Sequence, residues 1–223
     1  NEYAFDLAYS MKLSDQFSAG LTMRYIYSNL TGGIFVEGLQ TEAGKSFAVD
    51  LGTYFQSKSF EMDGLESQWA AGMNISNIGG KISYTESGDD DFLPMNLKIG
   101  TRFSTKIDDY NEFAVAFDIN KLLVPTPPVY AVNDAGQPVD INGNTVQIGS
   151  PEHHILAGMN PNVGVIQGVF QSFYDAPGGI EEELNELMYS IGGEYWYDRQ
   201  FAFRFGYFHE HETKGNRKYF TIG

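Results

Sequence analysis

Apolar and polar side chains alternate with a period of two along most of the chain. Successive side chains of a β-strand point to opposite faces, so each alternating segment predicts a strand with one apolar face. The alternating segments are residues 3–11, 17–27, 47–55, 69–75, 97–103, 113–119, 195–197, 201–207 and 220–222. The pattern therefore predicts about nine strands and an all-β fold, and many of these strands approach the roughly 9–11 residues that a tilted strand needs to cross a bilayer.

The two faces of these strands differ in charge. One face combines Gly, Ala and Ser with charges of both signs, at Asp6, Lys12, Arg24, Asp50, Lys98, Arg102, Asp118 and Arg204. The other face is almost free of charge and dense in Phe, Tyr, Leu, Met and Val. Soluble barrels turn their apolar face inward, whereas outer-membrane barrels surround a polar interior with an apolar band. We therefore predict a transmembrane, antiparallel outer-membrane β-barrel, with a soluble β-sandwich as the alternative.

The lengths of the connections agree with a barrel, since short and long ones tend to alternate. Short connections lie at residues 14–16, 106–111 and 198–199, and long ones at residues 29–44, 77–93 and 122–188. Outer-membrane barrels have short periplasmic turns and long extracellular loops. Both ends of the chain fall inside strand-like patterns, so we expect a fragment of a larger barrel. Residues 1–223 then form one barrel segment, and residues 122–188 form a long, partly helical extracellular excursion.

The excursion contains a stiff proline-rich strip, and helices are predicted over residues 163–173 and 181–188. Each proline fixes its own backbone and restricts the residue before it, so such a strip loses little entropy when a partner docks. The candidate partner-binding residues come from this strip and from the end of another long loop. Those of the strip are Val124, Pro125, Pro127, Pro128, Val129 and Tyr130, and those of the other loop are Phe92 and Leu93. The alternative is that both segments fold over the barrel mouth and plug it.

Composition excludes several classes of function. The chain has 14 basic and 29 acidic side chains, a formal net charge of −15, so it offers no basic surface for nucleic acid. It has no cysteine, which excludes disulfides and thiolate metal sites. Only 19% of its residues are charged and 15% are aromatic, a balance that argues against disorder.

The histidines are the only cluster that resembles a catalytic or metal site. His209 and His211 would share one face of a strand, but they lack the helical spacing of zinc proteases. His153 and His154 are adjacent, so on a strand they would point apart. The acidic run at residues 89–91 lacks the rest of a calcium-binding loop, and no Gly-x-Ser-x-Gly motif supplies a nucleophile. We therefore predict no catalytic residues, metal or cofactor.

Several stretches resemble one family of outer-membrane proteins. They include Asn-Ile-Ser-Asn-Ile-Gly at residues 74–79, Phe-Leu-Pro-Met-Asn-Leu at 92–97 and Leu-Leu-Val-Pro-Thr-Pro-Pro at 122–128. They continue with Asp-Ala-Pro-Gly-Gly at residues 175–179 and Gly-Tyr-Phe-His-Glu at 206–210. From about residue 74 onward, the chain resembles the PorV family, also called LptO.

The resemblance implies a FadL-like barrel in the outer membrane of a Gram-negative bacterium, within the type IX secretion system of Bacteroidetes. Such proteins carry out no chemistry. They accept exported cargo by its C-terminal signal domain, associate with the giant outer-membrane translocon barrel, and pass cargo to a cell-surface sortase attachment complex. Outer-membrane lipid would surround the barrel. The FadL relationship also implies a channel for hydrophobic small molecules, and the LptO name implies a lipid deacylase, which would need a nucleophile.

Overall fold

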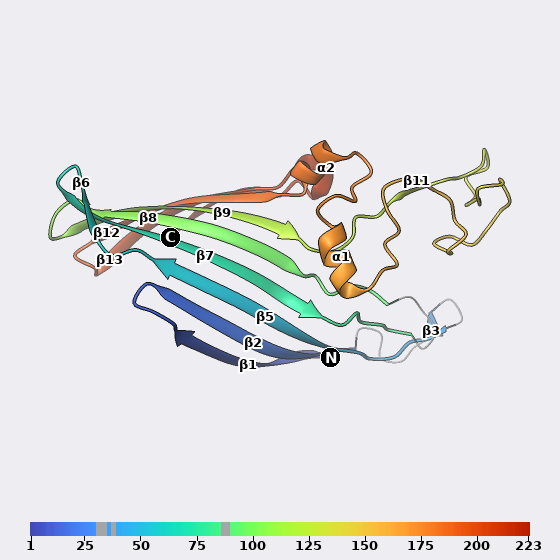
Figure 1. Ribbon diagram of the computed structural model, residues 1–223, viewed down its shortest axis with the longest axis horizontal. Coiled ribbons are helices and arrows are strands. Elements are labelled where there is room, and N and C mark those ends of the chain that lie inside the picture. The colour runs from blue at the N-terminus through green and yellow to red at the C-terminus, as the bar shows by residue number, and fades with distance from the viewer. Residues whose placement is uncertain (30–34, 37–38, 86–89) are drawn as a thin grey trace. The chain divides into compact units, whose positions relative to one another are not determined.

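The computed structural model describes residues 1–29, 35–36, 39–85 and 90–223 (Figure 1). The chain divides into two compact units. The sheet unit comprises Asn1–Leu122 and Leu187–Gly223, and the loop unit comprises Leu123–Glu186. The described residues contain no helix that is both long enough and apolar enough to cross a membrane.

The sheet unit is a ten-stranded antiparallel sheet, so the predicted all-β, barrel-type fold is confirmed. Its strands are β1 (Glu2–Lys12), β2 (Phe17–Ser28), β5 (Gly44–Gln56), β6 (Phe60–Met62), β7 (Leu65–Gly79), β8 (Asn96–Lys106), β9 (Asn111–Leu122), β12 (Met188–Tyr197), β13 (Phe201–His209) and β14 (Lys218–Ile222). Each long strand pairs with the next long strand along the chain, and β6 pairs with β7. The sheet is open, with β1 and β14 as its edge strands.

The remaining elements are short. Two-stranded ribbons form from β3 (Phe35–Val36) with β4 (Leu39–Gln40), and from β10 (Val129–Tyr130) with β11 (Ile155–Ala157). The loop unit also holds α1 (Val165–Gln171) and α2 (Ile180–Asn185), and a 3₁₀ turn, η1 (Glu212–Lys214), precedes β14. The helix predicted over residues 181–188 is therefore wrong at its C-terminal end, because Met188 begins β12. Gly192 and Gly193 interrupt the apolar alternation of β12, and this hid most of that strand from the sequence pattern.

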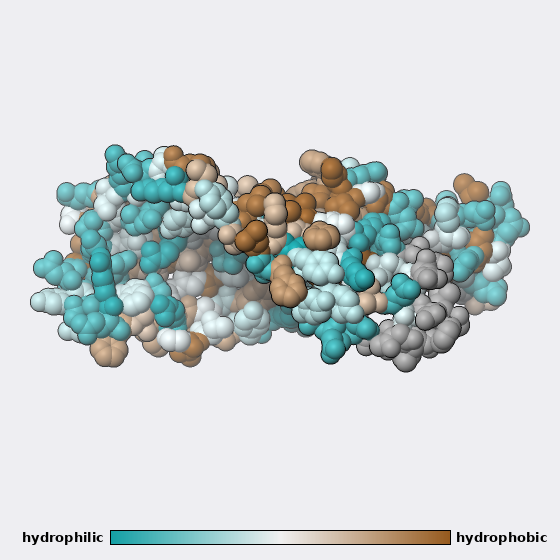
Figure 2. Space-filling view, turned by 90° about the horizontal axis from the view of Figure 1, so that it is seen from below, coloured by the Kyte–Doolittle hydropathy of each residue, from teal (hydrophilic) through white to brown (hydrophobic). Residues whose placement is uncertain are grey.

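The apolar face of the sheet is exposed rather than packed. Phe5, Leu7, Phe47 and Phe201 are each about 70% exposed, and Figure 2 shows that hydrophobic residues reach the surface on the face that it displays. The opposite face is hollowed into a groove of about 500 Å³, which marks it as the concave face. The structure therefore has the predicted arrangement, with apolar side chains outside and small or charged ones inside.

Charges on the concave face form ion pairs across neighbouring strands. The pairs are Arg24 with Asp6 and Asp50, Lys98 with Asp118, Arg102 with Glu112 and Glu194, and Arg204 with Glu194. The pairing of opposite signs lets a face with many charges lie inside a barrel-type sheet without a large repulsive field.

Candidate functional site

Short and long connections lie at opposite ends of the antiparallel sheet. The turns after β1, β8 and β12 are short and share one end, which we call the short-turn end. The connections after β2, β7, β9 and β13 share the other end, which we call the long-loop end. The loop unit is the connection after β9, so chain connectivity assigns it to the long-loop end. The candidate residues therefore all belong to long-loop connections.

The proline strip presents only part of its length to solvent. Pro127 and Val129 are exposed, and Val129 is 50% exposed. Val124 and Tyr130 are half-buried. Pro125 and Pro128 are buried, so these two predicted residues do not form the outer surface of the strip.

The strip is held by Thr126, a residue that sequence reasoning missed. Its backbone N–H donates to Oδ2 of Asp175 at 3.1 Å, and its hydroxyl donates to Oε1 of Glu186 at 2.8 Å. Gln171 Nε2 donates to the same Asp175 oxygen at 3.2 Å. Asp175 is 1% exposed, and burial raises the pKa of its carboxyl despite these hydrogen bonds. A single carboxylate thus joins the strip to the end of α1.

We expect Asp175→Ala to loosen the strip. The substitution leaves the buried Thr126 N–H without its acceptor and removes one of the two acceptors of the Gln171 amide, at a cost of about 1–3 kcal/mol. Thr126 carries the only backbone N–H of residues 125–128, so its hydrogen exchange reports on the strip alone. Exchange at Thr126 should rise roughly 5- to 150-fold in the whole protein.

Two variants serve as controls for this prediction. Asp175→Asn keeps a side-chain oxygen for the Thr126 N–H and should retain most of the protection. Asp134→Ala removes an exposed carboxylate of the same unit and should change nothing at Thr126. Equal exchange in Asp175→Ala and in the unmodified protein would contradict the assignment of Asp175 as the anchor.

The second predicted segment, Phe92–Leu93, belongs to the sheet unit. Leu93, predicted as a partner-binding residue, is 5% exposed and packs in a small core with Ala48 and Ile82, so its side chain is not accessible to a partner here. Phe92 is half-buried, and the ammonium group of Lys81 lies 4.3 Å from the centre of its ring. Phe92 therefore remains the one accessible apolar residue of this pair.

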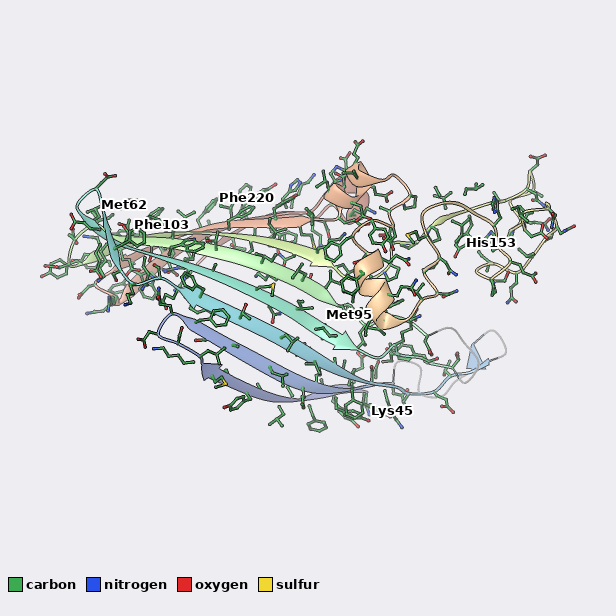
Figure 3. All side chains as sticks on the ribbon, viewed as in Figure 1. Lys45, Met62, Met95, Phe103, His153 and Phe220 are labelled. Carbon is green, nitrogen blue, oxygen red and sulfur yellow. The ribbon has the colours of Figure 1, made fainter. Side chains whose placement is uncertain are left out.

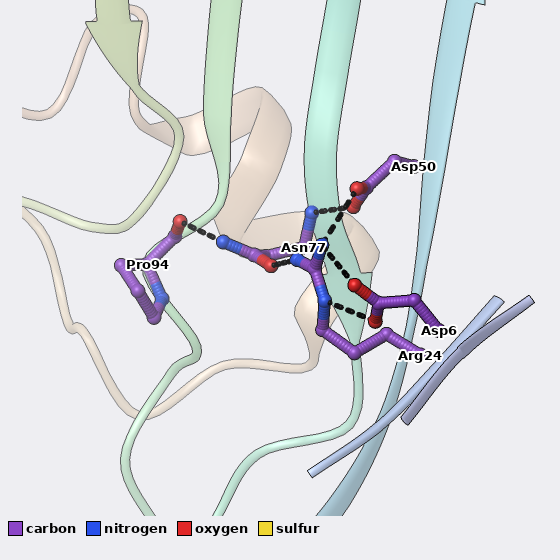
Figure 4. A network of polar contacts seen from close by, with 5 residues as sticks. All are labelled: Asp6, Arg24, Asp50, Asn77 and Pro94. Atoms are coloured by element: carbon purple, nitrogen blue, oxygen red, sulfur yellow. Dashed lines mark hydrogen bonds and ion pairs between the residues drawn. The ribbon is translucent and has the colours of Figure 1, made fainter. Parts of the chain in front are cut away.

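A polar network positions the Phe92 segment at the long-loop end of β7 (Figure 4). Asn77 has a positive φ of 59° and lies where the β5–β7 register shifts, opposite Asp50. Its backbone N–H donates to Asp50 at 2.7 Å, and its side chain accepts from Arg24 and donates to the Pro94 carbonyl at 3.1 Å. The Asn-Ile-Ser-Asn stretch thus carries a structural bulge whose Asn77 holds Pro94, close to Phe92 in the sequence.

The histidines have structural contacts. His153 is 5% exposed in the loop unit (Figure 3) and stacks on Tyr130 with ring centres 4.2 Å apart. Its Nδ1 accepts from the Gly149 N–H, so Nε2 carries the proton that it donates to the Ala131 carbonyl at 2.9 Å. His211 accepts from the Thr213 N–H in the turn before β14.

Glu210, rather than either neighbouring histidine, organises that turn. It accepts from Arg217 Nε at 2.8 Å and from Arg217 Nη2 at 2.7 Å, and this guanidinium holds the pKa of the Glu210 carboxyl below its usual range. No group of three or more His, Cys, Asp or Glu side chains suited to a metal occurs among the described residues, and Asp89 of the acidic run lies outside them.

Sequence reasoning also missed exposed apolar side chains on both helices. Ile166 and Phe170 lie one turn apart on α1 and are 75% and 64% exposed. Ile180 and Leu184 lie one turn apart on α2 and are 81% and 57% exposed. We call these four residues the helix surface. The spacing of three or four residues was the available signal, but both helices are too short for a clear amphipathic pattern.

Comparison with known families gives a match. The family model described as type IX secretion system protein PorV matches residues 1–129, which include every strand from β1 to β9. The match covers more than half of the chain, and it includes the Asn77 bulge, Phe92 and most of the proline strip. No curated protein matches the chain. With its barrel-type antiparallel sheet and this match, the chain belongs to the PorV family of the type IX secretion system.

Proposed function

We propose that this chain binds exported cargo and passes it from the translocon to the surface attachment complex. Membership of the PorV family makes it a component of type IX secretion, associated with the outer membrane. The observation that carries the finer proposal is the loop unit, a compact unit of 64 residues inserted between two neighbouring strands. Loops on a rigid scaffold are the usual place for binding residues, and a simple connection between strands needs only a few residues.

The exposed face of the sheet supports insertion in the outer membrane. Phe5, Leu7 and Phe47 are 68%, 73% and 72% exposed. An apolar patch of this extent on a water-soluble surface would drive association, whereas hydrocarbon chains satisfy it. We therefore place lipid against the outer face and the long-loop end outside the cell.

The test of cargo binding is a photocrosslinking scan in living cells of the native organism. A photoreactive residue at Val129 or Phe92, both accessible, should crosslink to cargo or to the translocon. The same residue at Asp15 or Asp109, in turns at the short-turn end, should not. Crosslinks from Asp15 and Asp109, with none from Val129 or Phe92, would place the partner surface on the periplasmic side and contradict the proposal.

The groove on the concave face supports a second candidate, a site for a hydrophobic small molecule. Gly20, Gly52, Gly72 and Gly100 lie along this groove, and Lys98 and Arg102 line it as well. A slender apolar molecule would fit over the small residues with a polar end near the cations. A fluorescent long-chain fatty acid should then bind the protein in vesicles, and Gly52→Phe should abolish its binding. Unchanged binding in Gly52→Phe would exclude the groove. No observation favours a lipid deacylase.

A further inference from the structure

The loop unit has an unusual charge composition. Its 64 residues contain eight acidic side chains and no lysine or arginine, so its formal net charge is −8. All 14 basic residues of the chain lie in the sheet unit. An excess of one sign over a whole unit produces a field that attracts partners of the opposite sign and repels those of the same sign.

Part of this charge serves the unit's own structure, and part is available to a partner. Asp140, Asp175 and Glu186 accept hydrogen bonds within the unit. The exposed carboxylates of Asp134, Glu152 and Glu181 lie on three different segments. The available negative charge is therefore distributed around the unit and is not confined to one acidic cluster.

The apolar helix surface lies in the same unit as these charges. Ile180, at 81% exposure, directly precedes Glu181, and Ile166 and Phe170 expose most of their side chains on α1. Burying such side chains contributes about 25 cal/mol for each Å² of apolar area removed from water. Apolar contact gives affinity, and the net negative charge of the unit selects the partner and accelerates encounter.

We propose that the helix surface docks a protein whose contact area is apolar at its centre and rich in lysine and arginine around it. This inference rests on the proposed function and specifies the chemistry of the cargo or translocon surface involved. Anionic lipid is disfavoured as the occupant, because a unit without a single basic residue is repelled by an anionic membrane surface.

The experiment combines crosslinking with charge reversal in the whole protein in native outer membranes. A photoreactive residue replaces Ile166 or Ile180, and the test variant adds Asp134→Lys, Glu152→Lys and Glu181→Lys. The crosslink to protein should fall about tenfold or more, since complementary charge raises association rates by roughly 10- to 1,000-fold. Raising the salt concentration should weaken the crosslink of the unmodified chain but not the residual crosslink of the variant.

Two further variants separate charge from folding. Asp134→Asn, Glu152→Gln and Glu181→Gln together should give an intermediate loss. The matched control, Asp15→Lys with Glu61→Lys and Asp109→Lys, reverses three exposed acids of the sheet unit and should leave the crosslink unchanged. All variants are compared at equal abundance in the membrane and with equal resistance of the loop unit to protease.

The outcomes also distinguish this inference from the proposed function. If crosslinking to cargo or translocon is unchanged by charge reversal and by salt, the inference of a basic partner surface is wrong, while the proposed cargo binding stands. Crosslinks from Ile166 and Ile180 to lipid alone would overturn the helix surface as a protein site. Absence of protein crosslinks from Val129 and Phe92 as well would overturn the proposed function itself. A charge-sensitive crosslink whose partner peptide is rich in Lys and Arg supports the inference.

Discussion

Phe117→Arg should destabilise the folded protein by about 2–4 kcal/mol in lipid vesicles, the cost of placing an arginine on a lipid-facing barrel position at mid-depth. Phe117 is the seventh of the twelve residues of β9 and lies on the apolar face, where its ring stacks on Tyr189 with centres 6.3 Å apart. It is 39% exposed, and its strand β9 is paired with β8 on one side and with β12 on the other. With lipid against this face, as proposed, the arginine would lie in hydrocarbon.

The matched control places the same arginine on the other face. Ser190 of β12 lies on the charged, concave face. It pairs directly with Asp118, the residue that follows Phe117 in β9. Ser190→Arg should therefore be tolerated far better than Phe117→Arg. Urea titration of the protein folded into vesicles gives both free energies of unfolding. Equal stability of Phe117→Arg and the unmodified protein would mean that lipid does not contact this face.

The fold was predictable where apolar side chains recur at every second position of a strand. The β9 segment shows this well, because Val115 and Phe117 alternate with Ala116 and Asp118, and the structure separates them onto opposite faces. The alternation failed in β12, where Gly192 and Gly193 carry no side chain to reveal a face. Gly193 pairs with Val115 on the apolar face, so a strand with glycine at a position of its apolar face is harder to recognise than one with large side chains there.

The site was less predictable because its contacts join residues that lie far apart in the sequence. Thr126 is fixed by Asp175 and Glu186, which follow it by 49 and 60 residues. Leu93 was predicted as a partner-binding residue at the end of a long loop, but it packs against Ile82 and Ala48. No local pattern reports such pairings. Charge composition, in contrast, does not depend on which residues are in contact, so the absence of basic residues from the loop unit can be read from the sequence alone.

Gly79→Ala should destabilise the protein by about 1–3 kcal/mol, the usual cost of overpacking a tight site. A Cβ atom at Gly79 would overlap the Phe47 carbonyl oxygen and would lie 2.9 Å from both the Ala48 Cα and the Leu93 Cδ1. The two nearest backbone atoms belong to the paired strand β5, so they cannot move aside without breaking the ladder. Leu93 would therefore shift, and the Phe92 segment with it.

Gly193→Ala provides the control, because a Cβ at Gly193 of β12 meets no atom within 4 Å. It should change the free energy of unfolding by no more than about 0.5 kcal/mol. Leu93 directly precedes Pro94, whose carbonyl accepts a hydrogen bond from Asn77. Because a shift of Leu93 would move Phe92 as well, Gly79→Ala should also reduce crosslinking from Phe92 while leaving crosslinking from Val129 unchanged. Loss of stability without any change at Phe92 would show that the segment is held by Asn77 alone. Unchanged stability in Gly79→Ala would show that β5 and β7 separate more readily than their backbone pairing implies.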